Sequence, residues 1–202
     1  MARYTGPKHR LARREGANIL EKTSASLARR LMVPPGVHGP KGGRMKHSEY
    51  SLQLREKQKA KRAYGLLEKQ FRKYYEEAAK VAGKTGEALL QTLERRLDNS
   101  LYRLALVPSR MMGRQLVSHG HVLVNGKKVN IPSYQLKIND VITLSPKALE
   151  MPAVKKMLET AEPKIPDYFE RQAAVGRLKK IPNREEIPIE VNEQLIIEFY
   201  SR

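Results

Sequence analysis

The spacing of apolar residues changes from helical to strand-like near the middle of the chain, and this change constrains the fold most. Four leucines recur at intervals of four, four and three residues, as on one face of a helix: Leu93, Leu97, Leu101 and Leu104. Beyond Pro108, apolar residues flank Asn125-Gly126, the preferred pair for a type I′ hairpin turn. The sequence therefore predicts two helices joined to a small antiparallel sheet within residues 93–144.

Helical patterns also lie on both sides of this region. One stripe recurs at alternating spacings of four and three residues: Leu67, Phe71, Tyr74, Ala78 and Val81. Ser48 is a suitable N-cap for the preceding helix, and Pro152 opens another short helix. Residues 168–180 resemble a strand pair. The end from Asn192 is predicted as a helix, with a strand as the alternative because of its β-branched residues.

Positive charge is concentrated in the first part of the chain. Of the 202 residues, 39 are Lys or Arg and 21 are Asp or Glu, and residues 1–62 contain 16 of the basic but 4 of the acidic ones. Residues 93–146 contain 8 against 3, whereas residues 147–202 are balanced at 10 of each. A folded chain with a net charge of +18 repels itself unless an anionic partner neutralises it. We therefore expect two anion-facing regions, with nucleic acid as the leading partner.

Residues 1–44 lack sustained periodicity. Three arginines have the spacing of one helix face: Arg10, Arg13 and Arg14. Beyond them, Pro34-Pro35-Gly36 and the Gly- and Pro-rich run at 39–43 break any regular element. We expect this segment to gain order mainly by contact with a partner; a basic disordered tail is the alternative.

Signatures of catalysis and of metal binding are absent from the sequence. Without any Cys, the chain has no disulfide, thiolate nucleophile or Cys-based zinc site. It also has no Gly-rich phosphate loop and no nucleophile elbow, and His119 and His121 lack the spacing of helical metal ligands. No apolar run reaches 18 residues, and the N-terminus does not resemble a secretory signal. We therefore predict a protein that is not an enzyme and has no cofactor, metal, membrane or small-molecule substrate.

A first group of candidate binding residues surrounds the predicted helix after Pro108. Arg110 and Arg114 lie one turn apart, and the helix start at Ser109 offers free backbone N–H groups and a positive dipole end to a phosphate. Arg can fork two phosphate oxygens, and neutral donors can reach phosphate or ribose. An ordinary basic surface helix is the alternative. The group comprises Arg96, Arg103, Ser109, Arg110, Arg114, Gln115, Ser118 and His119, with Lys127 and Lys128 at the hairpin tip.

A second group lies in the helices before residue 75. Only Glu56 and Glu68 are acidic between residues 50 and 75, so pairing within this segment cannot neutralise its cations. We predict contact with nucleic acid, in which tyrosines donate to phosphates or stack on bases; a solvated amphipathic helix is the alternative. The group comprises Arg55, Lys57, Gln58, Lys59, Lys61, Arg62, Tyr64, Lys69, Arg72 and Lys73. The N-terminal region adds Arg3, Tyr4, Lys8, Arg10, Arg13, Arg14 and Arg44.

Four segments in order resemble the family of the bacterial small-subunit ribosomal protein S-four over essentially the whole chain. The first is MARYTGPKHRLARREG and the second is YSLQLREKQKAKRAYGLLEKQFRKYYEEA. The third is LERRLDNSLYRLAL, followed by SR and GRQLVSHGHVLVNGKKVNIPSY, and the last is NEQLIIEFYSR. The third segment also resembles a module that other RNA-binding proteins share.

The resemblance implies an α+β fold with three parts. A basic extension over 1–44 is ordered by RNA. A helical domain over 45–92 and 183–202 is interrupted by an RNA-binding module with an antiparallel sheet over 93–182. The family's RNA-contacting positions match here at Arg96, Ser109, Arg110, Gln115 and the Ser118-His119-Gly120 turn, besides the basic N-terminal region. Some members carry a Cys-rich zinc knot, which this chain lacks, so we expect no cofactor.

The resemblance also implies a structural component of the small ribosomal subunit that binds rRNA early in assembly. It would lie beside neighbouring small-subunit proteins at the channel where messenger RNA enters, and influence decoding accuracy. Some members repress their own messenger. The expected location is the small ribosomal subunit in the bacterial cytoplasm, with a plastid origin less expected. Two other functions stay open: an RNA-modifying enzyme such as a pseudouridine synthase, which would need a large additional domain, and a free-standing RNA chaperone or regulator.

The chain departs from the family pattern at Met111-Met112-Gly113, where small and polar residues are expected. Gly within a helix costs about 1 kcal/mol relative to Ala. The sequence therefore predicts a slightly softened recognition helix.

Overall fold

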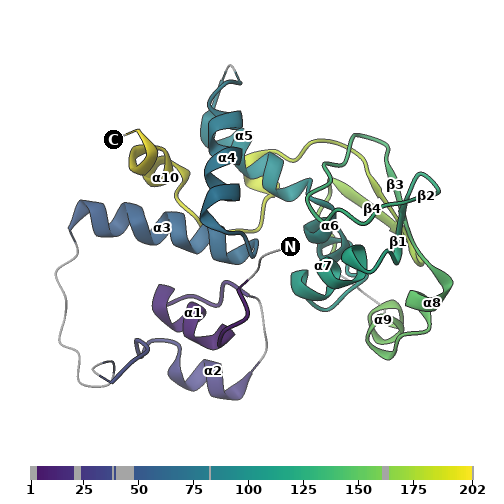
Figure 1. The fold of residues 1–202 in the computed structure, drawn as a ribbon, viewed down its shortest axis with the longest axis horizontal. Helices are drawn as coiled ribbons and strands as arrows, with labels where there is room; N and C mark the ends of the chain where they lie inside the picture. Colours follow the sequence, from purple (N-terminus) through teal and green to yellow (C-terminus); the bar gives the residue numbers. More distant parts are fainter. Residues whose placement is uncertain are drawn as a thin grey trace. The chain divides into compact units, whose positions relative to one another are not determined.

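The computed structural model describes residues 4–20, 24–37, 39, 48–81, 83–160 and 164–201. The chain forms two compact units, one from Met1–Gly86 with Glu190–Arg202 and the other from Glu87–Ile189 (Figure 1). The first unit is helical and the second combines helices with an antiparallel sheet, so the predicted α+β class is confirmed. Among the described residues, no helix has the length and hydropathy needed to cross a membrane.

The first unit contains α1 (Lys8–Glu15), α2 (Ala25–Arg30), α3 (Glu49–Ala63), α4 (Glu68–Ala78) and α10 (Glu193–Tyr200). The start of α5 (Thr85–Glu94) also belongs to it. The predicted N-cap is confirmed, because the Ser48 hydroxyl accepts a hydrogen bond from the Ser51 amide at 3.3 Å. Asn192 caps α10 in the same way by accepting from the Gln194 amide, so the predicted C-terminal helix is confirmed.

The N-terminal segment contains more regular structure than its sequence pattern indicated. Both α1 and α2 lie within residues 1–44, and each buries one apolar side chain, Ala12 and Leu27 respectively. The left-handed conformation of Gly16, with φ of 65°, ends α1. Each of these helices is shorter than three turns, so a search for sustained periodicity does not detect them.

The apolar stripe of α4 is shorter than predicted. Phe71, Tyr74 and Ala78 are buried, but Leu67 and Val81 are 41% and 57% exposed. Leu67 is the N-cap of α4, and Val81 lies beyond its last turn. The stripe packs with α10 through aromatic rings, since the ring centroids of Phe71 and Tyr200 are 6.4 Å apart.

Glu68 connects three elements of this unit. Its carboxylate accepts hydrogen bonds from Lys57 Nζ at 2.8 Å, Lys61 Nζ at 2.7 Å and Tyr200 Oη at 2.8 Å. Burial by itself raises the pKa of this carboxyl, but the three donors outweigh burial and lower the pKa from 4.5 to about 2. The ionised form is therefore stabilised by folding.

We expect Glu68→Gln to destabilise the first unit at neutral pH and to have no effect near pH 2. The lowered pKa means that the contribution is complete above about pH 4.5 and is lost as the pH falls towards 2. Its size should be about 1 kcal/mol, because the carboxylate is partly exposed and screened by solvent. Urea unfolding of both proteins between pH 7 and pH 2 measures the difference. A difference that stayed constant with pH would contradict the assignment.

Among its described residues, the second unit has three helices before the sheet and two after the third strand. The first three are the rest of α5, α6 (Leu97–Arg103) and α7 (Arg110–Ser118). The strands are β1 (Val122–Val124), β2 (Lys127–Lys128), β3 (Val141–Leu144), β4 (Phe169–Gln172) and β5 (Val175–Leu178). Between β3 and β4 lie α8 (Pro146–Leu149) and α9 (Pro152–Leu158), and a 3-10 turn covers Arg184–Glu186. The described strands form an antiparallel sheet in the order β2-β1-β3-β5-β4.

The predicted hairpin is confirmed. Val124 pairs with Lys127, and Asn125 and Gly126 between them have φ of 50° and 77°, which Asn and Gly tolerate. The strand pair predicted within residues 168–180 is also confirmed as β4 and β5.

The leucine row is buried as predicted, but it does not lie on one continuous helix. All four leucines are fully buried. The chain leaves α5 after Glu94, adopts an extended conformation at Arg96 and starts α6 at Leu97. At the break, Arg96 forms an isolated bridge with Gln135, and the Leu97 amide donates to the Tyr134 carbonyl at 3.0 Å. A backbone pairing with a distant segment therefore interrupts the helix.

The core of the second unit lies between α6, α7 and the sheet. Leu101, Leu116, Ile142 and Tyr168 are among its buried members. Gly113 brings α7 close to α6, because a Cβ atom on Gly113 would lie 2.6 Å from the Asp98 carbonyl oxygen. Gly113 therefore lies at a close contact between two helices. The prediction of a softened helix considered only the helix propensity of Gly and did not consider this contact.

Candidate nucleic-acid interface

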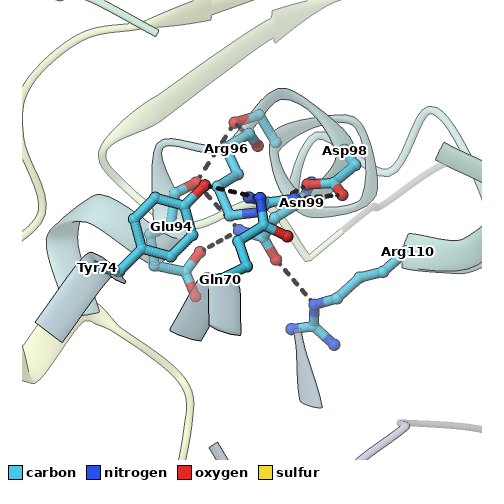
Figure 2. A network of polar contacts seen from close by, with 8 residues as sticks. Gln70, Tyr74, Glu94, Arg96, Asp98, Asn99 and Arg110 are labelled. Atoms are coloured by element: carbon cyan, nitrogen blue, oxygen red, sulfur yellow. Dashed lines mark hydrogen bonds and ion pairs between the residues drawn. The ribbon is translucent and has the colours of Figure 1, made fainter. Parts of the chain in front are cut away.

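A buried carboxylate organises the region between α5 and α7. Glu94 accepts hydrogen bonds from Arg103 Nη2 at 2.8 Å and Arg103 Nε at 3.0 Å, and from the Tyr168 hydroxyl at 3.0 Å. Asn99 Nδ2 donates to the same carboxylate at 2.7 Å (Figure 2). Burial raises the pKa of Tyr168, and the adjacent Glu94 charge raises it further, so the phenol stays a hydrogen-bond donor.

A second buried ion pair lies at the start of α6. Arg96 is completely buried, and its Nη2 and Nε donate to the two carboxylate oxygens of Asp98 at 2.9 and 3.2 Å. Arg103, whose residue is 6% exposed, is held by Glu94. The sequence predicted that Arg96 and Arg103 contact nucleic acid. In the structure both guanidinium groups are buried against carboxylates, and that of Arg103 joins α6 to α5. Contact of these two arginines with nucleic acid stays a prediction.

A third arginine, at the start of α7, is less buried than the two arginines of the ion pairs. Ser109 caps the helix by accepting a hydrogen bond from the Met112 amide at 3.3 Å. Arg110, the first residue of α7, is half-buried, and its Nε donates to Asn99 Oδ1 at 2.8 Å (Figure 2). Its guanidinium carbon lies 4.5 Å from the centroid of the Tyr102 ring. Arg114, one turn later, is buried, so Arg110 is the more accessible of the two arginines expected on one face of this helix.

The far end of α7 and the hairpin tip expose polar side chains. Gln115, Ser118 and His119 are exposed, and so are both hairpin lysines. The Lys128 side chain lies against Gly120, because a Cβ atom at Gly120 would overlap its Cε atom. We call this set the α7–hairpin surface: Ser109, Arg110, Gln115, Ser118, His119, Lys127 and Lys128.

The basic residues of α3, in the first unit, are largely paired with carboxylates. Lys57 and Lys61 bind Glu68, and Lys57 is only 5% exposed. Arg55 and Arg62 both bind Glu15 of α1, with Arg55 Nη1 at 3.2 Å from Glu15 Oε1. The cations of α3 therefore share three carboxylates, Glu15, Glu56 and Glu68, so pairing neutralises only part of this face. One of the three, Glu15, reaches α3 from about 40 residues earlier and lies outside the segment in which the acids were counted.

The other residues of the first unit that were predicted to contact nucleic acid differ in their pairing and in their exposure. Lys59 lies 3.8 Å from Glu56, and two exposed pairs lie along α4, Arg72–Glu76 and Lys73–Glu77. Tyr64 is buried, Gln58 is half-buried and Lys69 is exposed.

The predicted contacts of the N-terminal region also differ in their hydrogen bonds and in their exposure. Arg13 donates to the carbonyls of Val33 and Pro34 at 2.8 and 3.1 Å and so joins α1 to a later loop. Arg10, Arg14 and Tyr4 are exposed and Lys8 is half-buried. Arg3 and Arg44 lie outside the described residues.

Sequence reasoning missed the acidic and amide members of these networks. Glu94, Asp98 and Asn99 lie among arginines inside the leucine row, and Glu15 follows Arg13 and Arg14. Acids next to a buried apolar row were the available signal, because a buried charge needs a partner. In the described part of the chain, no group of three or more His, Asp or Glu side chains could hold a metal ion.

Comparisons with known proteins cover the whole chain. Residues 3–94 match the family model for the ribosomal protein S4/S9 N-terminal domain, and residues 95–142 match the S4 domain. The chain is 53% identical to the small ribosomal subunit protein uS4 of Cutibacterium acnes. It is 50% identical to the proteins of that name from Brevibacillus brevis and Akkermansia muciniphila. Each alignment spans 100% of both chains.

Proposed function

Because the chain belongs to the small ribosomal subunit protein uS4 family, we propose that it is a structural component of the small subunit and binds rRNA. The family consists of ribosomal proteins and not of enzymes. One observation supports the proposal most: the S4-domain match at 95–142 covers α6, α7 and the first hairpin, which together carry the α7–hairpin surface. The net charge of +18 supplies the attraction to a polyanion.

In this proposal, affinity comes mainly from neutralised phosphates and specificity from the shape of the RNA. Lys127 and Lys128 act as exposed point charges at the hairpin tip. Arg110 and the capped start of α7 offer directed donors to phosphate oxygens. Gln115, Ser118 and His119 add neutral donors at the other end of the same helix.

Replacing Lys127 and Lys128 together with Ala should weaken binding to a small-subunit rRNA transcript. It should also reduce the slope of log K against log salt concentration by about 1 to 2, because each lost phosphate contact removes a released counterion. Filter binding at several salt concentrations measures both quantities. The matched control replaces Lys155 and Lys156 of α9 with Ala, a pair of exposed lysines in the same unit. Equal slopes for the two double variants would contradict the assigned surface.

The finer parts of the proposal rest on the family resemblance. We propose that the protein binds rRNA early in assembly, next to small-subunit proteins at the channel where messenger RNA enters, and that it influences decoding accuracy in a bacterial cytoplasm. We also propose that rRNA completes the order of residues 1–44. Sedimentation of ribosomal subunits distinguishes a structural component from a free-standing RNA chaperone. A structural component should be present in small subunits in stoichiometric amounts, whereas a free-standing chaperone should not.

A further inference from the structure

The side-chain amide of Asn99 is held in a single orientation. Its Nδ2 donates to the Glu94 backbone carbonyl at 3.0 Å and to Glu94 Oε2 at 2.7 Å. Carbonyl and carboxylate oxygens only accept hydrogen bonds, so the amide nitrogen faces Glu94 and the amide oxygen faces away from it. Asn99 is 2% exposed, so water does not compete for these positions.

The amide oxygen faces Arg110. It accepts from Arg110 Nε at 2.8 Å, while the Tyr102 ring lies 4.5 Å from the guanidinium carbon. A guanidinium is planar, and a hydrogen bond at one edge together with a ring beside it restricts its direction. Arg110 is also the first residue of α7, at the positive end of the helix dipole.

The carboxylate behind Asn99 is itself fixed. Arg103 binds both oxygens of Glu94, and the Tyr168 hydroxyl binds Oε2. A continuous set of contacts therefore runs from the buried Glu94 through Asn99 to Arg110, as Figure 2 shows.

We propose that Asn99 is a positioning residue for RNA binding, which orients the Arg110 guanidinium towards a phosphate of the rRNA without touching the RNA itself. The inference rests on the proposed rRNA binding and deepens it. Preorganising a long side chain reduces the conformational entropy that binding would otherwise remove. A lysine at the same position could carry the charge but could not take up this orientation, since it has no Nε–H group and no planar fork.

A double-mutant cycle on the full chain tests the proposal. Affinity for a small-subunit rRNA transcript is measured for the unmodified protein, Asn99→Ala, Arg110→Ala and the double variant, with thermal unfolding recorded in parallel. We expect each single change to weaken binding about tenfold to 100-fold, the size of one charged hydrogen bond. In the Arg110→Ala background, Asn99→Ala should have no further effect. Losses that multiply would mean that Asn99 acts independently of Arg110 and would overturn the proposal.

Arg110→Lys provides a second test that leaves Asn99 and Glu94 intact and does not depend on how Asn99→Ala folds. We expect Arg110→Lys to bind nearly as weakly as Arg110→Ala. The matched control is Arg177→Lys, because Arg177 Nη2 donates to Asn139 Oδ1 at 2.6 Å in another Arg–Asn pair of the same unit. That control should bind as tightly as the unmodified protein. Full affinity of Arg110→Lys would show that charge alone matters and would overturn the positioning role.

The outcomes also separate this inference from the proposed function. If the unmodified protein does not bind the transcript, the proposed function fails. If it binds, and the paired Ala changes at Lys127 and Lys128 weaken binding, while Arg110→Lys has full affinity, only the positioning role of Asn99 fails.

Discussion

Replacing Glu94 with Ala should lower the free energy of unfolding of the second unit by about 3–5 kcal/mol, the range for breaking a buried ion pair on one side. The Glu94 side chain is fully buried and the Arg103 side chain is 5% exposed. Removing the carboxylate leaves the Arg103 guanidinium without its bidentate partner and removes the acceptor of the Tyr168 hydroxyl. Neither group can turn to water, so the desolvation cost is not offset.

Urea unfolding, together with hydrogen exchange of the α6 and β5 amides, measures this loss. The matched control is Glu170→Ala, which removes a glutamate from an ion pair of the same unit whose side chains are 37% and 51% exposed. That change should cost less than about 1 kcal/mol. If the two variants lost similar stability, Glu94 would not be the organising group of the network. A Glu94→Gln variant keeps one acceptor oxygen and should lie between the two.

Replacing Glu15 with Lys should detach α1 from α3. The Glu15 side chain is 1% exposed and binds both Arg55 and Arg62, so the substitution would bring a third cation to a buried site between two others. A buried charge without its partner is strongly destabilising, by about 3 kcal/mol or more. Because α1 can leave without unfolding α3, the loss should appear as local opening. Hydrogen exchange of the α1 amides should therefore accelerate by about 100-fold, the rate equivalent of that energy.

Two variants make the Glu15 experiment specific. Burial raises the pKa of Glu15 even though Arg55 and Arg62 lie beside it, so a neutral side chain is tolerated there better than a cation. Glu15→Gln should consequently accelerate exchange much less. Glu76→Lys reverses the charge of an exposed glutamate in α4 and should leave α1 unchanged. Equal exchange rates of α1 in Glu15→Lys and Glu76→Lys would refute the docking role.

These two carboxylates also show why charge counted along the sequence does not reveal which cations are paired inside the fold. Arginines were assigned to RNA because basic side chains are abundant near them and acids are few in the same segment. The partners are nevertheless close in space: Glu94 lies nine residues before Arg103, and Glu15 lies 47 residues before Arg62. A count of charge along a segment does not say which acid lies beside which cation, and it omits an acid such as Glu15 that the fold brings in from another segment. The members of the α7–hairpin surface, by contrast, lie close together along the chain, and their contact with RNA stays a prediction.

Local chemistry determined the elements that the sequence alone predicted. Asn125-Gly126 forms its turn because both residues tolerate positive φ, and Ser48 and Asn192 begin helices because their side chains bind the first free amides. The leucine spacing likewise predicted which side chains are buried. Each of these signals depends on neighbours within a few residues, so it can be read directly from the chain.

Only the tertiary structure decided where the leucine row breaks and which cations remain available to a ligand. The break at Arg96 follows from backbone pairing with Gln135, and the burial of Arg96, Arg103 and Lys57 follows from carboxylates placed beside them. The physical reason is the same in each case. The free energy of a charge depends on its burial and its partners in three dimensions, and the periodicity of a sequence describes neither.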